Sequence, residues 1–129
     1  MLPLADVTDP MAFGGKAVAL GSAMRAGLPV PDGVALSVDT VEAVVRADPD
    51  DVPALHRVCA GGGPRAVRSS AVGEDSAGAS FAGAHCTVLG VCDPEAVVAA
   101  VRRVHASADA PQARAYRAQL GLGDRKSVV

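Results

Sequence analysis

A short apolar segment that ends in Arg-Ser-Ser and opens into a loop of small residues constrains this fold more than any other feature. Arg68 follows two apolar residues at strand-like spacing, and the loop behind it contains Gly73, Gly78 and Gly83. Glycines let the backbone bend close to a ligand and direct its N–H groups inward. The sequence therefore predicts a strand around Ala66–Arg68 followed by an anion-binding loop, and phosphate is the anion that suits it.

Large side chains for a core are scarce. Half of the residues are hydrophobic, but only 2% are aromatic, namely Phe13, Phe81 and Tyr116. The core must therefore rest on Ala, Val and Leu, which bury less area per residue than aromatic side chains do. A length of 129 residues suits one domain or a piece of a larger one.

The charge balance argues against several classes of partner. A net charge of −2 creates no basic field for nucleic acid, and the few aromatic residues offer almost no stacking platform. No apolar run approaches the roughly 20 residues that cross a bilayer, and the first ten residues do not resemble a secretory signal. We expect a cytoplasmic protein with no membrane partner, and Cys59, Cys86 and Cys92 as reduced thiols.

Apolar periodicity and capping residues predict helices separated by short strands. Ala17–Arg25 carries a helical apolar stripe that Gly27 can end, and Asp93-Pro94-Glu95 is a strong helix start. The expected buried face of that later helix consists of Val97, Val98, Val101 and Val104. Three further helices are expected: one from a cap at Ser37 or Asp39 to before Pro49, one at Val52–Cys59 and one at Pro111–Leu120. Further strands are expected at Gly33–Ser37 and His85–Val91.

Helices interleaved with short strands indicate an α/β or α+β fold with a mixed sheet. Five ordered motifs, within a match that extends from about residue 13 to residue 121, then make the prediction specific. They resemble the amino-terminal nucleotide-binding domain of phosphoenolpyruvate synthases, which pyruvate phosphate dikinases and rifampicin phosphotransferases share. The motifs are Gly14–Gly21, Ala26–Gly33, Ala66–Ser70, Glu74–Ser76 and Ala79–Gly83.

The resemblance implies an ATP-grasp fold in which ATP lies between two subdomains. On the family pattern, Lys16 matches the lysine that contacts ATP phosphates, and Arg68 and Ser69 belong to the Arg-Ser-Ser motif. Gly83 and Thr87 match the loop that closes over the phosphates. Ammonium and guanidinium groups suit phosphate oxygens because they donate charge-assisted hydrogen bonds. Phosphoryl transfer depends mainly on positioning and charge neutralisation, so it needs no nucleophile from this chain.

The resemblance also implies that this chain is part of a larger enzyme. Family members continue into a second ATP-grasp half, which supplies Mg²⁺ ligands, and into a domain whose histidine carries the phosphate to an acceptor. Neither His56, His85 nor His105 lies in the expected histidine motif, and residues 124–129 do not continue the apolar strand of the family. We expect pyruvate as acceptor, with a rifamycin-type antibiotic as the alternative, no turnover by this chain alone, and the remaining domains as possible partners in trans.

Other interpretations of the same residues stay open. Lys16 alone would be an ordinary surface lysine, Ser69 and Ser70 can cap or turn the local backbone, and Glu74 and Asp75 can form a solvated turn. Gly14-Gly-Lys16 is not a Walker loop, since the outer positions do not match.

Two other functions compete with the phosphotransferase. One is a non-catalytic module that binds a nucleotide or docks a partner. The other is a metal-binding regulatory protein, in which His56, Cys59, His85 and Cys86 supply soft ligands for zinc. The spacing lacks the paired Cys-x-x-Cys or His-x-x-x-His signatures of zinc sites, which weakens the second alternative.

Overall fold

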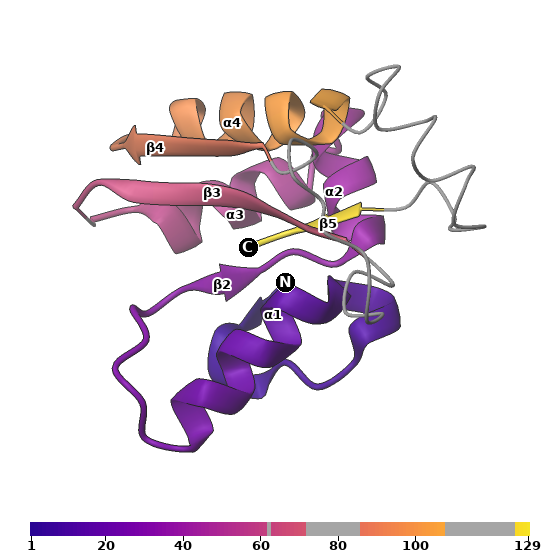
Figure 1. The fold of residues 1–129 in the computed structure, drawn as a ribbon. Coiled ribbons are helices and arrows are strands. Elements are labelled where there is room, and N and C mark those ends of the chain that lie inside the picture. Colours follow the sequence, from indigo (N-terminus) through magenta and orange to yellow (C-terminus); the bar gives the residue numbers. More distant parts are fainter. Residues whose placement is uncertain (62, 72–85, 108–125) are drawn as a thin grey trace.

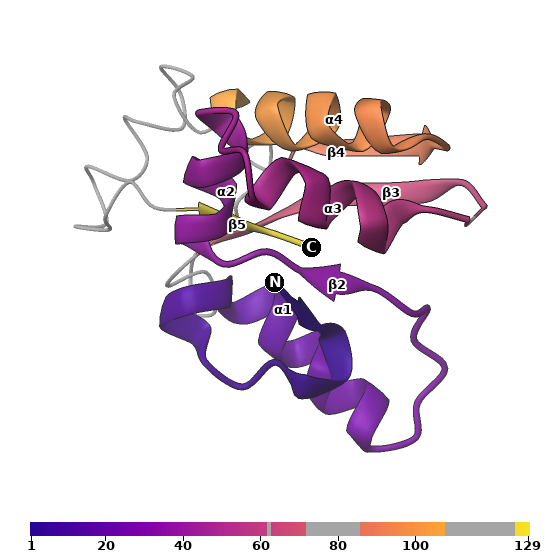
Figure 2. The ribbon, with the colours of Figure 1, turned by 180° about the vertical axis from the view of Figure 1, so that it is seen from behind.

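The computed structural model describes residues 1–61, 63–71, 86–107 and 126–129. Short strands form a central layer with helices on both sides (Figures 1 and 2). Helix α1, Pro10–Arg25, lies on one side of this layer. Helices α2, α3 and α4 cover the other side, and they span Val38–Val45, Asp51–Cys59 and Pro94–Ala106. The predicted mixture of helices and strands is confirmed.

Two small antiparallel sheets make up the central layer. Strand β1, Leu2–Pro3, pairs with β2, Val34–Ala35, and a short 3-10 helix at Leu4–Asp6 follows β1. The other sheet has the order β4-β3-β5. These strands span Thr87–Val91, Arg65–Ala71 and Lys126–Val128 in that order.

An antiparallel bridge between Leu36 and Val128 joins the two sheets. The Leu36 N–H donates to the Val128 carbonyl at 2.7 Å, and the Val128 N–H donates to the Leu36 carbonyl at 3.2 Å. Every strand pairing among the described residues is antiparallel. Hairpin-like pairing of this kind lets one face of a sheet remain open to solvent.

Side-chain caps fix where the helices begin. The Asp9 carboxylate accepts from the Met11 N–H at 2.8 Å, and the Asp93 carboxylate accepts from the Ala96 N–H at 2.8 Å. Of the two alternatives for α2, the structure uses Ser37, whose Oγ accepts from the Thr40 N–H at 3.2 Å. Such caps satisfy N–H groups that have no partner inside the helix.

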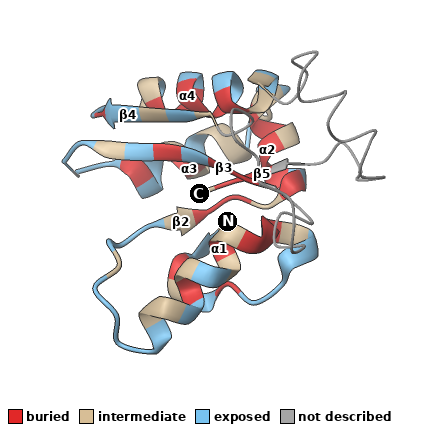
Figure 3. Ribbon diagram, in the orientation of Figure 1, coloured by how far each residue is buried: buried red, intermediate tan, exposed pale blue. Residues whose placement is uncertain are grey.

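Buried residues gather where the helices meet the strands (Figure 3). One apolar cluster joins α2, α3 and α4 to the sheet, and the four valines predicted for the buried face of α4 all belong to it. A smaller cluster lies under α1 and consists of Leu4, Val7, Phe13, Ala17 and Ala35. The layer of strands therefore separates two cores. Both cores consist mainly of aliphatic side chains, as the composition predicts.

Most predicted elements are found, with changed limits. The helix predicted at Ala17–Arg25 is the second part of a longer α1, and Gly27 follows its end with a φ of 77°. The strand predicted at Ala66–Arg68 extends over Arg65–Ala71, and that at His85–Val91 is described over Thr87–Val91. The helix predicted at Pro111–Leu120 lies outside the described residues.

The expectation for the last residues is wrong. Lys126–Val128 form strand β5, which pairs with β3 through Ser69 and Val128, Ser70 and Ser127, and Ala71 and Lys126. The segment did not look like a strand because it is short and has a polar residue at its centre. Ser127 is fully buried nevertheless, because its hydroxyl donates to main-chain carbonyls.

Candidate functional site

Helix α1 is interrupted at Gly14, which has φ 76° and ψ 160°. A second helical segment begins immediately after it, and its third residue, Ala17, directs its N–H toward strand β3. The Ser70 Oγ accepts this N–H at 3.1 Å. A hydroxyl bound to the third N–H is the geometry of an N-cap, but here the cap comes from a strand 53 residues further along the chain.

The helix and the strand approach each other closely at this point. A Cβ on Gly14 would lie 2.5 Å from the Ser70 Oγ and 2.7 Å from the Ser70 carbonyl carbon and oxygen. The Ser127 Oγ donates to the Ser70 carbonyl at 2.8 Å and also to the Phe13 carbonyl. We call Gly14, Ser70 and Ser127 the serine junction, because they lock α1, β3 and β5 together.

The serine junction brings together the two motifs that carry the predicted cations. The Lys16 Nζ donates to the Ser69 carbonyl at 3.0 Å, and Ser69 is the residue next to Arg68 in β3. Lys16 itself is half-buried. A lysine near the start of one helical segment is thus anchored on the main chain of the Arg-Ser-Ser strand.

Strand alternation places the Arg68 side chain on the α1 side of the sheet. Ser70 contacts α1, and residues two apart in a strand face the same way, so Arg68 points to the same side. Thr87 lies directly opposite Arg68 in β4, and cross-strand partners share a face. Arg68 and Thr87 are both exposed. Lys16, Arg68 and Thr87 therefore belong to the same face of the sheet, beside α1.

The other predicted site residues are placed differently. Ser69 points to the opposite face and is 1% exposed, and its Oγ has no hydrogen-bond partner in the part of the chain that the structure describes. It reaches the Lys16 side through its carbonyl instead. Gly83, Glu74 and Asp75 lie outside the described residues.

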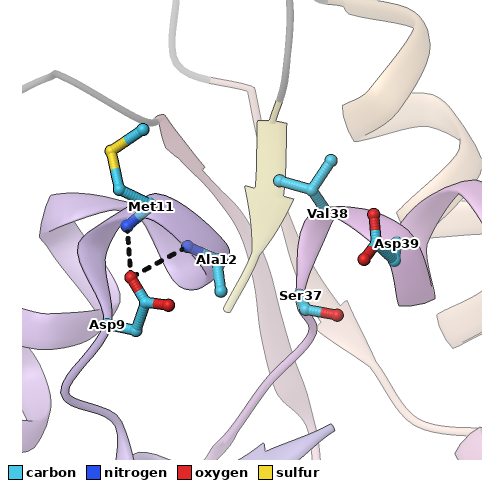
Figure 4. Close-up of a pocket in the computed structure, with 6 residues that line it drawn as sticks. All are labelled: Asp9, Met11, Ala12, Ser37, Val38 and Asp39. Carbon is cyan, nitrogen blue, oxygen red and sulfur yellow. Dashed lines mark hydrogen bonds between the residues drawn. The ribbon is translucent and has the colours of Figure 1, made fainter.

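An open cavity of about 250 Å³ lies between the starts of α1 and α2 (Figure 4). Its lining comes from Asp9, Met11 and Ala12 on one side and from Ser37, Val38 and Asp39 on the other. Among the described residues, the four predicted site residues Lys16, Arg68, Ser69 and Thr87 do not line it. The Asp9 carboxylate is occupied as the cap of α1, bonding the Met11 and Ala12 N–H groups at 2.8 and 3.3 Å.

The three cysteines are free thiols in different surroundings: Cys59 is buried, Cys86 is half-buried and Cys92 is exposed. No group of three His, Cys, Asp or Glu side chains suited to a metal ion is found in the described part of the chain. A search of the same part finds no helix that is long and apolar enough to cross a bilayer.

Alkylation should separate Cys59 from Cys92. Burial raises the pKa of the Cys59 thiol above its ordinary 9.0, and the Arg65 guanidinium opposes part of this shift. The thiolate attacks the methylene carbon of iodoacetamide and displaces iodide, so in the folded chain Cys92 should react first and Cys59 only after unfolding in urea. Peptide mass spectrometry after timed quenching measures both rates; equal rates in the folded chain would contradict the burial.

The same shift has a consequence for stability. Because the Cys59 pKa is higher in the folded than in the unfolded chain, its stabilising contribution is complete below pH 9.0. That contribution is lost as the pH rises through the raised value.

Sequence reasoning missed the serine junction. The sequence places Gly14 in the Gly14–Gly21 motif and Ser70 in the Arg-Ser-Ser motif, with capping or turning of its own local backbone as the alternative for Ser70, and neither prediction connects the two residues. The structure shows that Ser70 caps a distant helix. No spacing along the chain signals this, since residues 14, 70 and 127 meet only through tertiary packing.

Comparisons with known proteins agree with the motifs. A rifampicin phosphotransferase from Streptomyces sviceus is 43% identical over 90 residues, covering 67% of this chain and 10% of the relative. A protein named "Probable phosphoenolpyruvate synthase" from Archaeoglobus fulgidus is 32% identical over an alignment of 169 residues, covering 95% of this chain and 22% of the relative. The chain thus spans a small part of each. No solved structure matches it significantly.

The model of one protein family matches residues 52–128, more than half of the chain. That range contains the Arg-Ser-Ser strand, its partners β4 and β5, and the helix α4 that covers them. The chain therefore belongs to the family of the pyruvate phosphate dikinase AMP/ATP-binding domain.

Proposed function

We propose that this chain binds the phosphate groups of ATP through Lys16 and Arg68, as the nucleotide-binding portion of a phosphotransferase related to phosphoenolpyruvate synthase. One observation carries the proposal: the Lys16 ammonium lies 3.0 Å from the carbonyl of Ser69, the neighbour of Arg68. Two cations from segments 52 residues apart in the sequence thus belong to one sheet face. The family is described as an AMP/ATP-binding domain, which supports a nucleotide as ligand.

The chemistry of these groups suits a polyphosphate. The guanidinium of Arg68 is exposed and presents a planar set of donors that matches phosphate oxygens, while the Lys16 ammonium acts as a compact point charge. Thr87, opposite Arg68, adds a hydroxyl on the same face. Ser69 contributes its carbonyl, which holds Lys16, and Gly83 would contribute main-chain N–H groups from the following loop.

The complete reaction would need parts beyond this chain. We propose an ATP-grasp enzyme in which Mg²⁺ ligands come mostly from a second half, and a histidine on a further domain receives the phosphate and passes it to pyruvate. These parts would follow in a longer protein or act in trans, and the 129-residue chain alone would not turn over. A cytoplasmic location fits this role.

A second candidate acceptor is a rifamycin-type antibiotic. The relative from Streptomyces sviceus, named a rifampicin phosphotransferase, is 43% identical over 90 residues and supports this alternative. A non-catalytic nucleotide-binding or docking module is the remaining candidate. Phosphate transfer from labelled ATP to pyruvate by the 129-residue chain alone would overturn the division of labour proposed here.

Substituting either cation should weaken ATP binding. Lys16→Ala and Arg68→Ala each remove one charge-assisted contact, and such contacts are worth about 1.5 to 3 kcal/mol, so we expect a loss of about tenfold or more in affinity. Isothermal titration of the 129-residue chain with MgATP measures it. Titration with inorganic tripolyphosphate should show the same losses, because the proposed contacts are to phosphate.

Arg57→Ala is the matched control. Arg57 is an exposed arginine on α3, across the sheet from α1, so its removal changes the net charge equally without touching the proposed site. Its ATP affinity should equal that of the original chain. Absence of ATP binding by the original chain, or equal affinities in all four proteins, would refute the proposed phosphate roles.

A further inference from the structure

We infer that Ser70 is a positioning residue for nucleotide binding, which acts through Lys16 rather than by touching the ligand. This inference rests on the proposed function, because it assumes that Lys16 contacts phosphate. Nothing in the family pattern separates Ser70 from Ser69, its neighbour in the Arg-Ser-Ser motif. The structure separates them, because the two side chains point to opposite faces of β3.

Ser70 makes one of the two contacts that place Lys16, and it is next in sequence to Ser69, which makes the other. Its Oγ accepts the N–H of Ala17, the residue after Lys16, at 3.1 Å. The residue before it, Ser69, accepts the Lys16 Nζ at 3.0 Å through its carbonyl. The main chain and the side-chain tip of Lys16 are therefore both tied to the same two residues of β3.

Ser70 cannot itself reach a ligand outside the protein. It is 0% exposed, Ser127 Oγ donates to its carbonyl at 2.8 Å, and Gly14 packs against its backbone. Its role must therefore pass through the residues that it holds. This distinguishes Ser70 from Arg68 and Thr87, which are exposed on the same face.

Holding Lys16 in advance of binding should raise affinity. A lysine side chain loses much rotational freedom when it is ordered, and a site that orders it beforehand avoids that loss at the moment of binding. Removing the Ser70 Oγ leaves the buried Ala17 N–H without its acceptor and loosens the first turn that carries Lys16. The substitution leaves the charge of the site unchanged but alters the position in which Lys16 is held.

A double-mutant cycle between Ser70 and Lys16 tests the inference. Ser70→Ala should lower MgATP affinity by about two- to twelvefold in the original chain, the range expected for one side chain that must be ordered on binding. In the Lys16→Ala background, the same substitution should have no further effect. Complete loss of the Ser70→Ala effect in that background is the non-additivity expected where one residue acts through the other.

Two further variants serve as controls for this experiment. Ser37→Ala removes a serine cap from α2 whose Oγ bonds Thr40 and not Lys16 or β3, so it should lower the unfolding midpoint without changing MgATP affinity. Ser70→Cys keeps nearly the same volume but accepts hydrogen bonds weakly, and it replaces Ser70→Ala if the alanine variant does not fold. Circular dichroism at the titration temperature establishes folding in each case.

The outcomes separate this inference from the proposed function. If Lys16→Ala weakens MgATP binding while the Ser70 variants bind as the original chain does, or if the two effects simply add, the positioning role is wrong and the phosphate site survives. If Lys16→Ala changes nothing, or the original chain binds no MgATP, both proposals fall. Equal loss of affinity in Ser37→Ala and Ser70→Ala would assign the effect to general destabilisation and would also overturn the inference.

Discussion

Gly14→Ala is expected to destabilise the chain more than the same substitution at any other described glycine. Gly14 has φ 76° and ψ 160°, a backbone region that is essentially restricted to glycine and costs other residues about 1 to 3 kcal/mol. The added Cβ would also lie 2.7 Å from the Ser70 carbonyl carbon and oxygen, which are main-chain atoms that cannot rotate away. Overpacking of this kind adds about 1 to 3 kcal/mol, so we expect a total loss of about 2 to 6 kcal/mol.

Urea unfolding followed by circular dichroism measures this loss, and Gly27→Ala is its matched control. Gly27 also has a positive φ, 77°, but apart from its neighbours in the chain no atom of the described residues lies within 4 Å of the position where its Cβ would be. The control should lose about 1 kcal/mol, the usual cost of alanine at a left-handed position. A Gly14→Ala variant no less stable than Gly27→Ala would show that the approach to Ser70 is looser than described.

Gly21→Ala should be destabilising although alanine is the better helix former. Gly21 lies inside α1, where the exchange would ordinarily gain about 1 kcal/mol. In this chain the new Cβ would overlap the Leu4 carbonyl oxygen and lie 3.2 Å from the Val7 carbonyl oxygen. Both oxygens belong to the segment around the 3-10 helix, which the Arg25 guanidinium also holds by donating to the Ala5 carbonyl at 2.6 Å.

We expect Gly21→Ala to lower the free energy of unfolding by about 2 kcal/mol, which thermal unfolding detects as a fall of several degrees in Tm. Ser22→Ala provides the comparison, because Ser22 is in the same helix but exposed. That variant should be as stable as the original chain or slightly more so. If Gly21→Ala were more stable than the original chain, that result would contradict the close packing of α1 against the 3-10 helix.

These two glycines explain part of the Gly14–Gly21 motif in physical terms. Gly14 lets α1 meet β3, and Gly21 lets α1 meet the segment after β1. Neither role requires a ligand. The glycines of this motif are needed for packing, and the packing in turn places Lys16 beside Ser69.

The elements that local rules govern were predictable from the sequence. Helix α4 has an aspartate cap, a proline in its first turn and valines at helical spacing, and all three features appear in the structure as predicted. These features depend only on residues near one another in the chain, so the pattern alone suffices.

Strand β5 could not be predicted in the same way. Its central residue, Ser127, is polar, and it is buried only because the Phe13 and Ser70 carbonyls accept its hydroxyl from far along the sequence. A buried hydroxyl with two such acceptors is compatible with a core, but those acceptors are known only once the fold is known.

The sequence motifs indicate which residues belong to the candidate site, but they do not indicate how the side chains of those residues are arranged. Lys16 and Arg68 were identified from their motifs, and the structure places them on one sheet face. The buried orientation of the Ser69 side chain was not foreseen, because strand alternation reveals a face only when one residue of the strand has been placed. Ser70 supplies that reference point through its contact with α1.

The position of β5 in the chain has a consequence for how the protein folds as it is synthesised. Val128 bridges Leu36, and Ser127 bonds Phe13, which lies 114 residues earlier. The α1 layer and the three-helix layer can each collapse as they leave the ribosome, but joining them requires β5, which is translated after the other described elements. Pairing of β5 joins the most distant parts of the described chain, so we expect it to be the late, slow step of folding.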